Sequence, residues 1–316
     1  MSDRPLWKTL LAFGIVYFVW GSTFLAIRVG VHEVPPLLFA ALRFATAGAL
    51  LFGWTLKRGE QMPRGREWLS VTLLAALIFG CDYGLLFWAE TVVPSGIAAV
   101  MLATIPAFMA IAEVLLLRTR RFTLRLGAAL LVGLAGVAVL TLHGAGLGQA
   151  AISGMGAAAL VFAAMSWSVA SVLTRKLPLP ESKMVSSGTQ MLVGGVVLAI
   201  AAGPVGEYPR FHPAAVSAGA WWALAYLIVA GSIMGFTAYL WLIHHESPTR
   251  VGTYAYVNPV VAVALGHWLG GEELGLRVVV GSALVLGSVV AIVVGKPVKQ
   301  QAGKPAGQQV SETAKR

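Results

Sequence analysis

The sequence predicts an all-α membrane protein with ten transmembrane helices, arranged as two five-helix repeats of inverted topology. Three observations predict this fold class: the composition, ten long apolar stretches, and an echo between the two halves. Of the 316 residues, 58% are hydrophobic and 11% are charged, against roughly 25% charged in soluble proteins. A soluble chain of this size cannot hide so much apolar surface. The composition therefore excludes a soluble enzyme, a nucleic-acid-binding domain, a disordered chain and a secreted disulfide scaffold.

Each of the ten apolar stretches is long enough to cross a bilayer, which takes about 20 residues. We expect spans at roughly 8–28, 36–56, 69–89, 94–117, 125–143, 153–173, 184–203, 218–242, 249–270 and 277–295. The excess of glycine suits close helix packing in lipid. Residues 296–316 are polar and basic, and we expect them to form a disordered cytoplasmic tail.

The basic residues predict the orientation of the chain. With both termini in the cytoplasm, 19 of the 23 Lys and Arg residues fall on the inner side. Only Arg28, Arg210 and Arg277 fall outside, and Arg43 lies within a span. This asymmetry follows the positive-inside rule. The net charge of +10 therefore indicates topology, and we expect no nucleic-acid partner.

The two halves of the chain echo each other at an offset near 150 residues. The matching pairs are GAALLVG (Gly127–Gly133) with GSALVLG (Gly281–Gly287), Pro94-Ser95 with Pro248-Thr249, Pro106 with Pro259, and Trp20 and Arg28 with Trp167 and Arg175. Five spans are an odd number, so the second unit enters the membrane from the opposite side. We predict repeats at 1–148 and 149–295. The loop after the fourth span is basic (RTRRFTLR), whereas its counterpart after the ninth is acidic (GGEELGLR).

Several short motifs now support a resemblance to a known family. These are WGSTFLAIRVG in the first span, LRFATAG in the second, the prolines of the fourth and ninth, and G-x5-G in the fifth and tenth. In this order they resemble the drug/metabolite transporter superfamily, and in particular its EamA branch of ten-helix exporters, over about residues 10–295. The resemblance implies a central cavity between the repeats, a location in the bacterial inner membrane, and export of small metabolites, often amino acids or drug-like compounds. The family often has an acidic residue after the fourth span; here only the second repeat keeps one, in Glu272-Glu273.

Charges inside the bilayer are costly and usually functional. Arg43 and Asp82 each lie about 10 Å below the predicted outer surface at 1.5 Å per residue, so we predict an ion pair between them. The pair would either clasp two helices or take part in transport, with Arg43 meeting a substrate carboxylate or Asp82 taking up protons. Glu113, near Arg118, is expected to form an interfacial salt bridge.

Prolines, aromatic side chains and polar side chains within the spans complete the candidate site. Pro106 and Pro259 would kink the fourth and ninth spans at matching positions, as hinges. The expected substrate-binding residues are Trp20, Thr23, Arg43, Tyr83, Trp167, Gln190, Tyr239, Tyr254 and Asn258. Tyr and Trp suit a cavity for amphipathic solutes, and Gln190 is the repeat counterpart of Arg43. Helix packing or a place at the membrane interface is the alternative interpretation of these side chains.

The sequence favours a secondary transporter that exports small organic metabolites by alternating access. The solute gradient or proton antiport through Asp82 would drive it. An exchanger of phosphorylated or nucleotide-linked solutes is an alternative that would need several basic residues at cavity depth. An intramembrane enzyme would need clustered catalytic side chains, and a scaffold or receptor would need an extramembrane domain. We expect no enzymatic activity, no cofactor and no metal. The partners would be a small-molecule substrate and the lipid bilayer, and the protein would be a monomer or weak homodimer.

Overall fold

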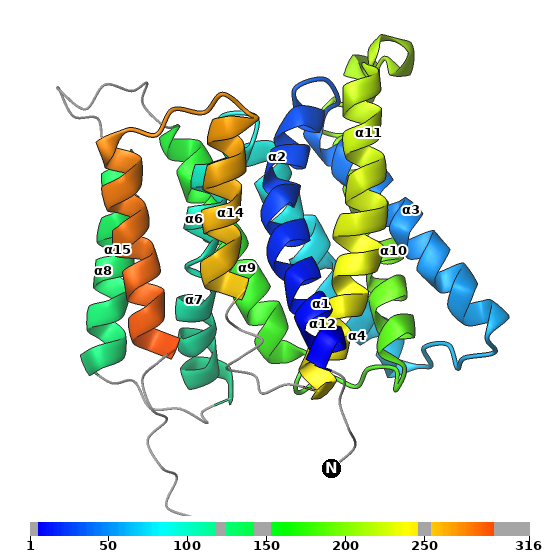
Figure 1. The fold of residues 1–316 in the computed structure, drawn as a ribbon. Helices are drawn as coiled ribbons and strands as arrows, with labels where there is room; N and C mark the ends of the chain where they lie inside the picture. The colour runs from blue at the N-terminus through cyan, green and yellow to red at the C-terminus, as the bar shows by residue number, and fades with distance from the viewer. Residues whose placement is uncertain (1–5, 118–123, 142–152, 246–253, 294–316) are drawn as a thin grey trace, which may run out of the picture.

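The computed structural model describes residues 6–117, 124–141, 153–245 and 254–293. Within these ranges the chain is helical throughout and contains no strand (Figure 1). Seven helices are long and apolar enough to cross a membrane, and shorter apolar helices lie within 127–139, 257–268 and 276–288. These helices confirm an all-α membrane protein. The basic loop that begins at Arg118 and the tail at 296–316 lie outside the described residues.

Several of the helices continue into one another without a loop. The elements in chain order are α1 (Leu6–Gly14), η1 (Ile15–Val19), α2 (Trp20–Val31), α3 (Pro36–Lys57), α4 (Arg66–Ala75), η2 (Ala76–Tyr83), α5 (Gly84–Ala89), α6 (Ser95–Leu102), α7 (Ile105–Ala112), η3 (Glu113–Leu117), α8 (Leu124–Thr141), α9 (Gly154–Leu173), α10 (Lys183–Ala202), α11 (Ala218–Tyr226), η6 (Leu227–Met234), α12 (Gly235–His245), α14 (Tyr254–Trp268) and α15 (Leu276–Val293). Figure 1 shows the helices roughly upright, with the start of α1 at the lower end.

Helices from the first half of the chain pack against helices from the second half. Helix α3 lies along α10, α8 along α15, and α6 against α14, while α2 contacts α11 and α9 contacts η2. The α3–α10 contact is close because it is made by glycines: a methyl group at Gly48 would lie 2.7 Å from Cα of Leu192, and one at Gly195 would lie 2.7 Å from Cα of Ala45. Small residues allow such close packing of helix backbones in lipid.

The third and eighth spans each contain a π-helical segment of eight residues, η2 and η6. The two segments start 151 residues apart, and at the same offset Gly80 and Gly84 correspond to Gly231 and Gly235. A π-helical turn admits an extra residue and changes which side chains face a neighbour, and it often marks a functional site. The two segments therefore place special geometry at equivalent points of the two halves.

The prolines act differently in the two halves. Pro106 lies in the first turn of α7, after a break between Leu102 and Ile105, so the fourth span is two helices. The Thr104 hydroxyl donates to the Met101 carbonyl oxygen at 2.7 Å within this break. Pro259 lies inside α14 without ending it. Their role as hinges remains a prediction.

Glutamates from each half cap helices of the other half. The Glu207 carboxylate, which follows α10, accepts hydrogen bonds from the backbone N–H groups of Leu37 at 3.2 Å and Leu38 at 2.9 Å, at the start of α3. Glu60, which follows α3, accepts a hydrogen bond from the hydroxyl of Ser182, the N-cap of α10. Each helix of the α3–α10 pair is therefore held at its N-terminus by the loop that follows the other.

A third glutamate acts in the same way at the upper end. Glu33 accepts hydrogen bonds from the hydroxyl of Ser217 at 2.7 Å and from its backbone N–H at 2.6 Å, at the start of α11. These hydrogen bonds lower the pKa of the Glu33 carboxyl. A carboxylate is favourable there because the N–H groups at a helix N-terminus carry partial positive charge.

We predict that Glu207→Gln destabilises the protein by about 1–2 kcal/mol, because the amide replaces one acceptor oxygen with a donor that faces a backbone N–H. Glu207 is only 1% exposed, so water cannot replace the lost bond. Thermal unfolding in detergent measures the effect, with the exposed Glu181→Gln as the control. Equal melting temperatures for both variants would contradict the capping role.

Candidate functional site

Arg43 lies on α3 in a cage of aromatic rings and is 2% exposed. Its guanidinium carbon lies 4.7 Å from the ring centroid of Phe44, 5.4 Å from that of Tyr83 and 5.9 Å from that of Phe87. Its Nε donates to the hydroxyl of Ser232 on η6 at 3.1 Å. We call these five residues the Arg43 cage. A desolvated cation over an aromatic ring gains about 2 kcal/mol, so the rings partly replace the lost hydration.

The predicted ion pair between Arg43 and Asp82 is wrong. Arg43 is held by Ser232 and the rings, and no contact within 4.0 Å joins it to the Asp82 carboxylate. Asp82 and Tyr83 are neighbours on η2 and point roughly a quarter turn apart. Tyr83 is therefore the residue of this pair that contacts Arg43. Asp82 is 2% exposed, and its Oδ1 has no hydrogen-bond partner among the described residues.

A second cluster surrounds Trp20 on α2. Its ring centroid lies 5.3 Å from that of Tyr239 and 5.5 Å from that of Tyr254. With its nitrogen turned toward them, the Asn258 amide donates to the carbonyl oxygens of Tyr17 and Tyr254, each at 3.2 Å. We call Trp20, Tyr239, Tyr254 and Asn258 the Trp20 cluster. The structure therefore brings together four of the predicted site residues, from three helices.

The Arg43 cage and the Trp20 cluster meet at the π-helical segment η6. Trp20 Nε1 donates to the carbonyl oxygen of Gly231 at 3.1 Å, one residue before Ser232. A methyl group at Gly231 would lie 2.9 Å from Cγ2 of Thr23 and 3.1 Å from Nη2 of Arg43. Thr23, Trp20 and Arg43 therefore all press against one turn of η6, and a shift of this turn would move all three.

The remaining predicted site residues are connected less directly. The Trp167 ring lies 6.1 Å from that of Tyr83, between centroids, at the edge of the Arg43 cage. Gln190 donates to the hydroxyl of Ser186 on its own helix at 2.9 Å, so its amide does not mirror the contact that Arg43 makes with η6. Glu113 forms a salt bridge with Arg175 at 2.9 Å, whereas its expected neighbour Arg118 lies outside the described residues.

Three charged residues at the upper end were not among the predicted site residues. Glu272 Oε1 accepts hydrogen bonds from the backbone N–H and the hydroxyl of Ser95, each at 2.6 Å, and Oε2 accepts one from the N–H of Gly96 at 3.0 Å. The same carboxylate lies 3.5 Å from Nε of Arg28. Arg28 also donates to the backbone carbonyl of Glu90 at 3.1 Å. We call Arg28 and Glu272 the upper latch, because they join α2, the start of α6 and the segment before α15.

The sequence holds one signal for the upper latch. A serine and a glycine begin the predicted fourth span, and a serine at a helix start is a natural place for a carboxylate. Its partner Glu272 is 177 residues away, however, and only the fold brings the two together. Glu90 lies immediately after α5 and was missed because hydropathy alone places it at the membrane surface.

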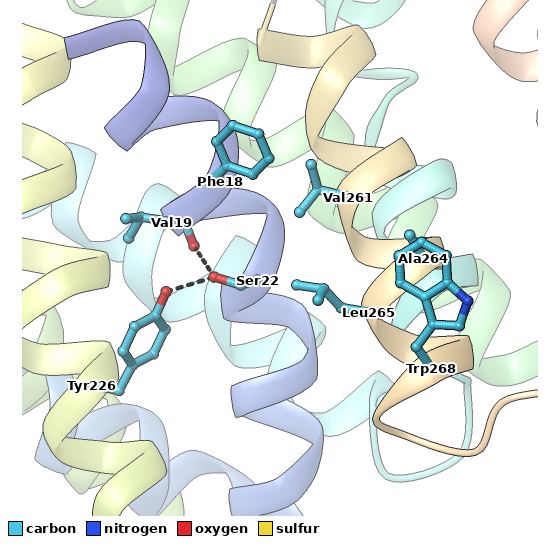
Figure 2. A pocket seen from close by; sticks show the side chains of 8 residues that line it. All are labelled: Phe18, Val19, Ser22, Tyr226, Val261, Ala264, Leu265 and Trp268. Atoms are coloured by element: carbon cyan, nitrogen blue, oxygen red, sulfur yellow. Dashed lines mark hydrogen bonds between the residues drawn. The ribbon is translucent and has the colours of Figure 1, made fainter. Parts of the chain in front are cut away.

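A hollow of about 350 Å³ lies on the flank of the bundle, between α2, α11 and α14. Figure 2 shows apolar side chains around it, with the hydroxyls of Ser22 and Tyr226 2.5 Å apart on one wall. The Trp268 side chain at its rim is 76% exposed. None of the predicted substrate-binding residues lines it, so the hollow is distinct from the Arg43 cage and the Trp20 cluster.

The side chains of the Arg43 cage can bind a solute through hydrogen bonds and ring contacts. The Nη1 of Arg43 is buried and has no hydrogen-bond partner among the described residues, so it can donate to an anionic oxygen. Aromatic rings around it suit an apolar or aromatic body. Among the described residues, no group of three or more His, Cys, Asp or Glu side chains could hold a metal ion.

Comparison with known proteins gives a consistent result. The sequence profile of the EamA-like transporter family matches residues 7–142 and 154–294. A protein of Escherichia coli strain K12 named "Uncharacterized inner membrane transporter YedA" is 39% identical over 272 residues, covering 85% of this chain and 84% of that protein. The "Uncharacterized transporter YoaV" of Bacillus subtilis strain 168 is 24% identical, covering 88% of this chain and 94% of that protein.

One solved crystal structure has the same fold. It superposes with a TM-score of 0.60 at 24% sequence identity, covering 91% of this chain and 97% of that one.

We predict that Gly235→Ala disrupts the Trp20 cluster. An added methyl group would overlap the Trp20 indole, with Cδ1 only 2.8 Å away, and a crowded helix contact of this kind costs about 1–3 kcal/mol. Thermal unfolding and tryptophan fluorescence detect the change. Gly219→Ala in α11 is the control, because its nearest atom would be 3.5 Å away; identical behaviour of the two variants would show that the indole does not depend on this contact.

Proposed function

The chain belongs to the EamA-like transporter family, and from this we propose that it is a secondary transporter that exports small organic solutes through the inner membrane. The observation that carries the proposal is the Arg43 cage. It offers a buried guanidinium with an unused donor, surrounded by aromatic rings. Its solutes would combine a carboxylate with an apolar or aromatic body, as apolar amino acids do.

The connection through η6 supports alternating access. Trp20 and Arg43 contact adjacent residues of the same π-helical turn, so a solute that displaces the guanidinium would also act on the Trp20 cluster. Movement would concentrate at the break before Pro106 and at Pro259, because proline removes a backbone hydrogen bond. The two repeats, 1–148 and 149–295, would rock against each other around this turn.

An exchanger of phosphorylated or nucleotide-linked solutes is less well supported. Binding of a phosphate group favours several cations at one point. The contacts of Arg43 are rings and a hydroxyl, which suit a single carboxylate. An intramembrane enzyme is likewise poorly supported, because Asp82 and Arg43 do not form the paired group that such chemistry would use.

The first test is a growth screen of cells that overexpress the wild-type protein or Arg43→Met. The panel contains toxic amino-acid analogues, dipeptides and cationic drugs. We expect the wild type to raise the tolerated concentration of carboxylate-bearing compounds several-fold, and Arg43→Met to abolish the gain because the carboxylate loses its partner. Membrane abundance of both proteins is measured by immunoblot. Resistance confined to cationic drugs and unchanged in Arg43→Met would overturn the proposed solute class.

The second test concerns proton coupling through Asp82, which we propose from its burial and its unpartnered oxygen. In proteoliposomes loaded with a compound from the screen, we expect an imposed pH gradient to drive wild-type transport. Asp82→Asn should lose this response while it retains downhill exchange. Cys81→Ser, at the neighbouring exposed position, is the matched control. Transport that responds neither to Asp82→Asn nor to the pH gradient would exclude coupling through this residue.

A further inference from the structure

Glu90 places a buried carboxyl group at the upper end of the bundle. Its side chain is fully buried, at 0% exposure. Both Oε1 and Oε2 lie away from solvent and have no hydrogen-bond partner among the described residues. Buried polar groups are almost always hydrogen-bonded, and an ionised carboxylate without hydrogen bonds is far more costly to bury than a neutral acid. The charge state of the Glu90 carboxyl therefore depends on the ionisable groups around it.

The ionisable groups around Glu90 come from several packed elements. Arg28 on α2 uses Nη1 for the backbone carbonyls of Glu90, at 3.1 Å, and Val93, at 2.8 Å. Glu272 and, more weakly, Arg43 on α3 also interact electrostatically with the Glu90 carboxyl. Helix α9, which packs against α5, carries no ionisable side chain. On its own span the nearest ones are Asp82 and Tyr83 on η2.

Among the described residues, no cation lies within 4.0 Å of the Glu90 carboxyl oxygens. The guanidinium of Arg28 lies 3.5 Å from the Glu272 carboxylate, and Arg43 is bound by Ser232 and the rings. An ionised Glu90 would therefore be a second anion beside one cation that already has its partner. Burial is the main cause that raises the pKa of the Glu90 carboxyl; Arg28 lowers it and Glu272 raises it further.

We propose that Glu90 is a proton-binding residue of the transporter, protonated while the upper latch between Arg28 and Glu272 is closed. When the latch opens, Arg28 leaves Glu272 and becomes free to pair with Glu90. The Glu90 carboxyl then gives its proton to water at the upper end and becomes a carboxylate beside the guanidinium, while Glu272 is hydrated. The role of this step in transport rests on the proposed function, whereas the protonation itself does not.

The test reads protonation directly in the purified full-length protein in lipid nanodiscs. Infrared spectroscopy at neutral pH detects the carbonyl stretch of a protonated carboxylic acid, which shifts in D₂O. We expect Glu90→Gln to remove part of the wild-type band, and to remove it also in an Asp82→Asn background. Glu181→Gln, at an exposed position, should leave the band unchanged. A band that is unaffected by Glu90→Gln in both backgrounds would overturn the proposal.

Stability against pH gives a second measurement. A carboxyl whose pKa is raised by folding stabilises the protein below its unfolded pKa, and this contribution is lost as pH rises through the folded pKa. The melting temperature of the wild type should therefore fall relative to that of Glu90→Gln as pH rises above about 4.3, the ordinary pKa of an unfolded glutamate. A difference in melting temperature between the two proteins that stays constant as pH rises would overturn the raised pKa of the Glu90 carboxyl.

These outcomes separate the two proposals. A Glu90-dependent carboxylic acid band together with transport that ignores the pH gradient would leave Glu90 as a proton site and remove proton coupling. Gradient-driven transport that persists in Glu90→Gln, together with the absence of a Glu90-dependent band, would overturn the proton-binding role of Glu90 and leave the proposed function in place.

Discussion

The fold depends on carboxylates that one half of the chain places at helix starts in the other half. Glu33 and Glu60, from the first half, hold the starts of α11 and α10. Glu207 and Glu272, from the second half, hold the starts of α3 and α6. A helix start has unsatisfied N–H groups, and at the buried residues Leu38 and Ser95, where α3 and α6 begin, water cannot satisfy them. Each half therefore completes the backbone hydrogen bonding of the other, which apolar packing in lipid cannot do because lipid tails compete equally for apolar surface.

The same shortage of water determines how the interior charges are arranged. Arg43 is surrounded by rings and one hydroxyl, and Arg28 is divided between two backbone carbonyls and Glu272. The carboxyl oxygens of Glu90 have no hydrogen-bond partner among the described residues. The surroundings of Arg43, Arg28 and Glu90 differ in which atoms they leave available for binding. A caged guanidinium keeps a donor for a solute, and a carboxyl without partners keeps a place for a proton. The turn of η6 at Gly231 and Ser232 connects the Arg43 cage with the Trp20 cluster, so in the proposed mechanism solute binding and helix movement act on the same backbone segment.

Local features of the sequence were sufficient for the all-helical membrane fold and for most of the Trp20 cluster. The hydropathy of a span depends only on the residues of that span. Tyr254 and Asn258 likewise lie one turn apart on the same helix. The failures involve distant partners. The similar depth of Arg43 and Asp82 suggested an ion pair between them. Depth does not show which way a side chain points, however, and in the π-helical segment η2 it is Tyr83 rather than Asp82 that faces Arg43. Glu272 and Ser95 are 177 residues apart, so their contact exists only in the folded chain. The repeated glycines of η2 and η6, 151 residues apart, were the available signal for the special geometry of spans three and eight.

The predicted inverted repeat has a consequence for the free energies of the two proposed transport states. If the halves were identical, exchanging them would leave the protein unchanged, and the states open to either side would have equal free energy. The acid that caps α6 from the loop before α15 is Glu272. The equivalent loop of the first half contains Arg118, Arg120 and Arg121, and no acidic residue occurs between Glu113 and Glu181. A cation at a helix N-terminus is unfavourable where a carboxylate is favourable. The Glu272 cap of α6 therefore has no acidic equivalent in the sequence of the first half, and in the proposed alternating-access mechanism this difference makes the states open to either side unequal in free energy.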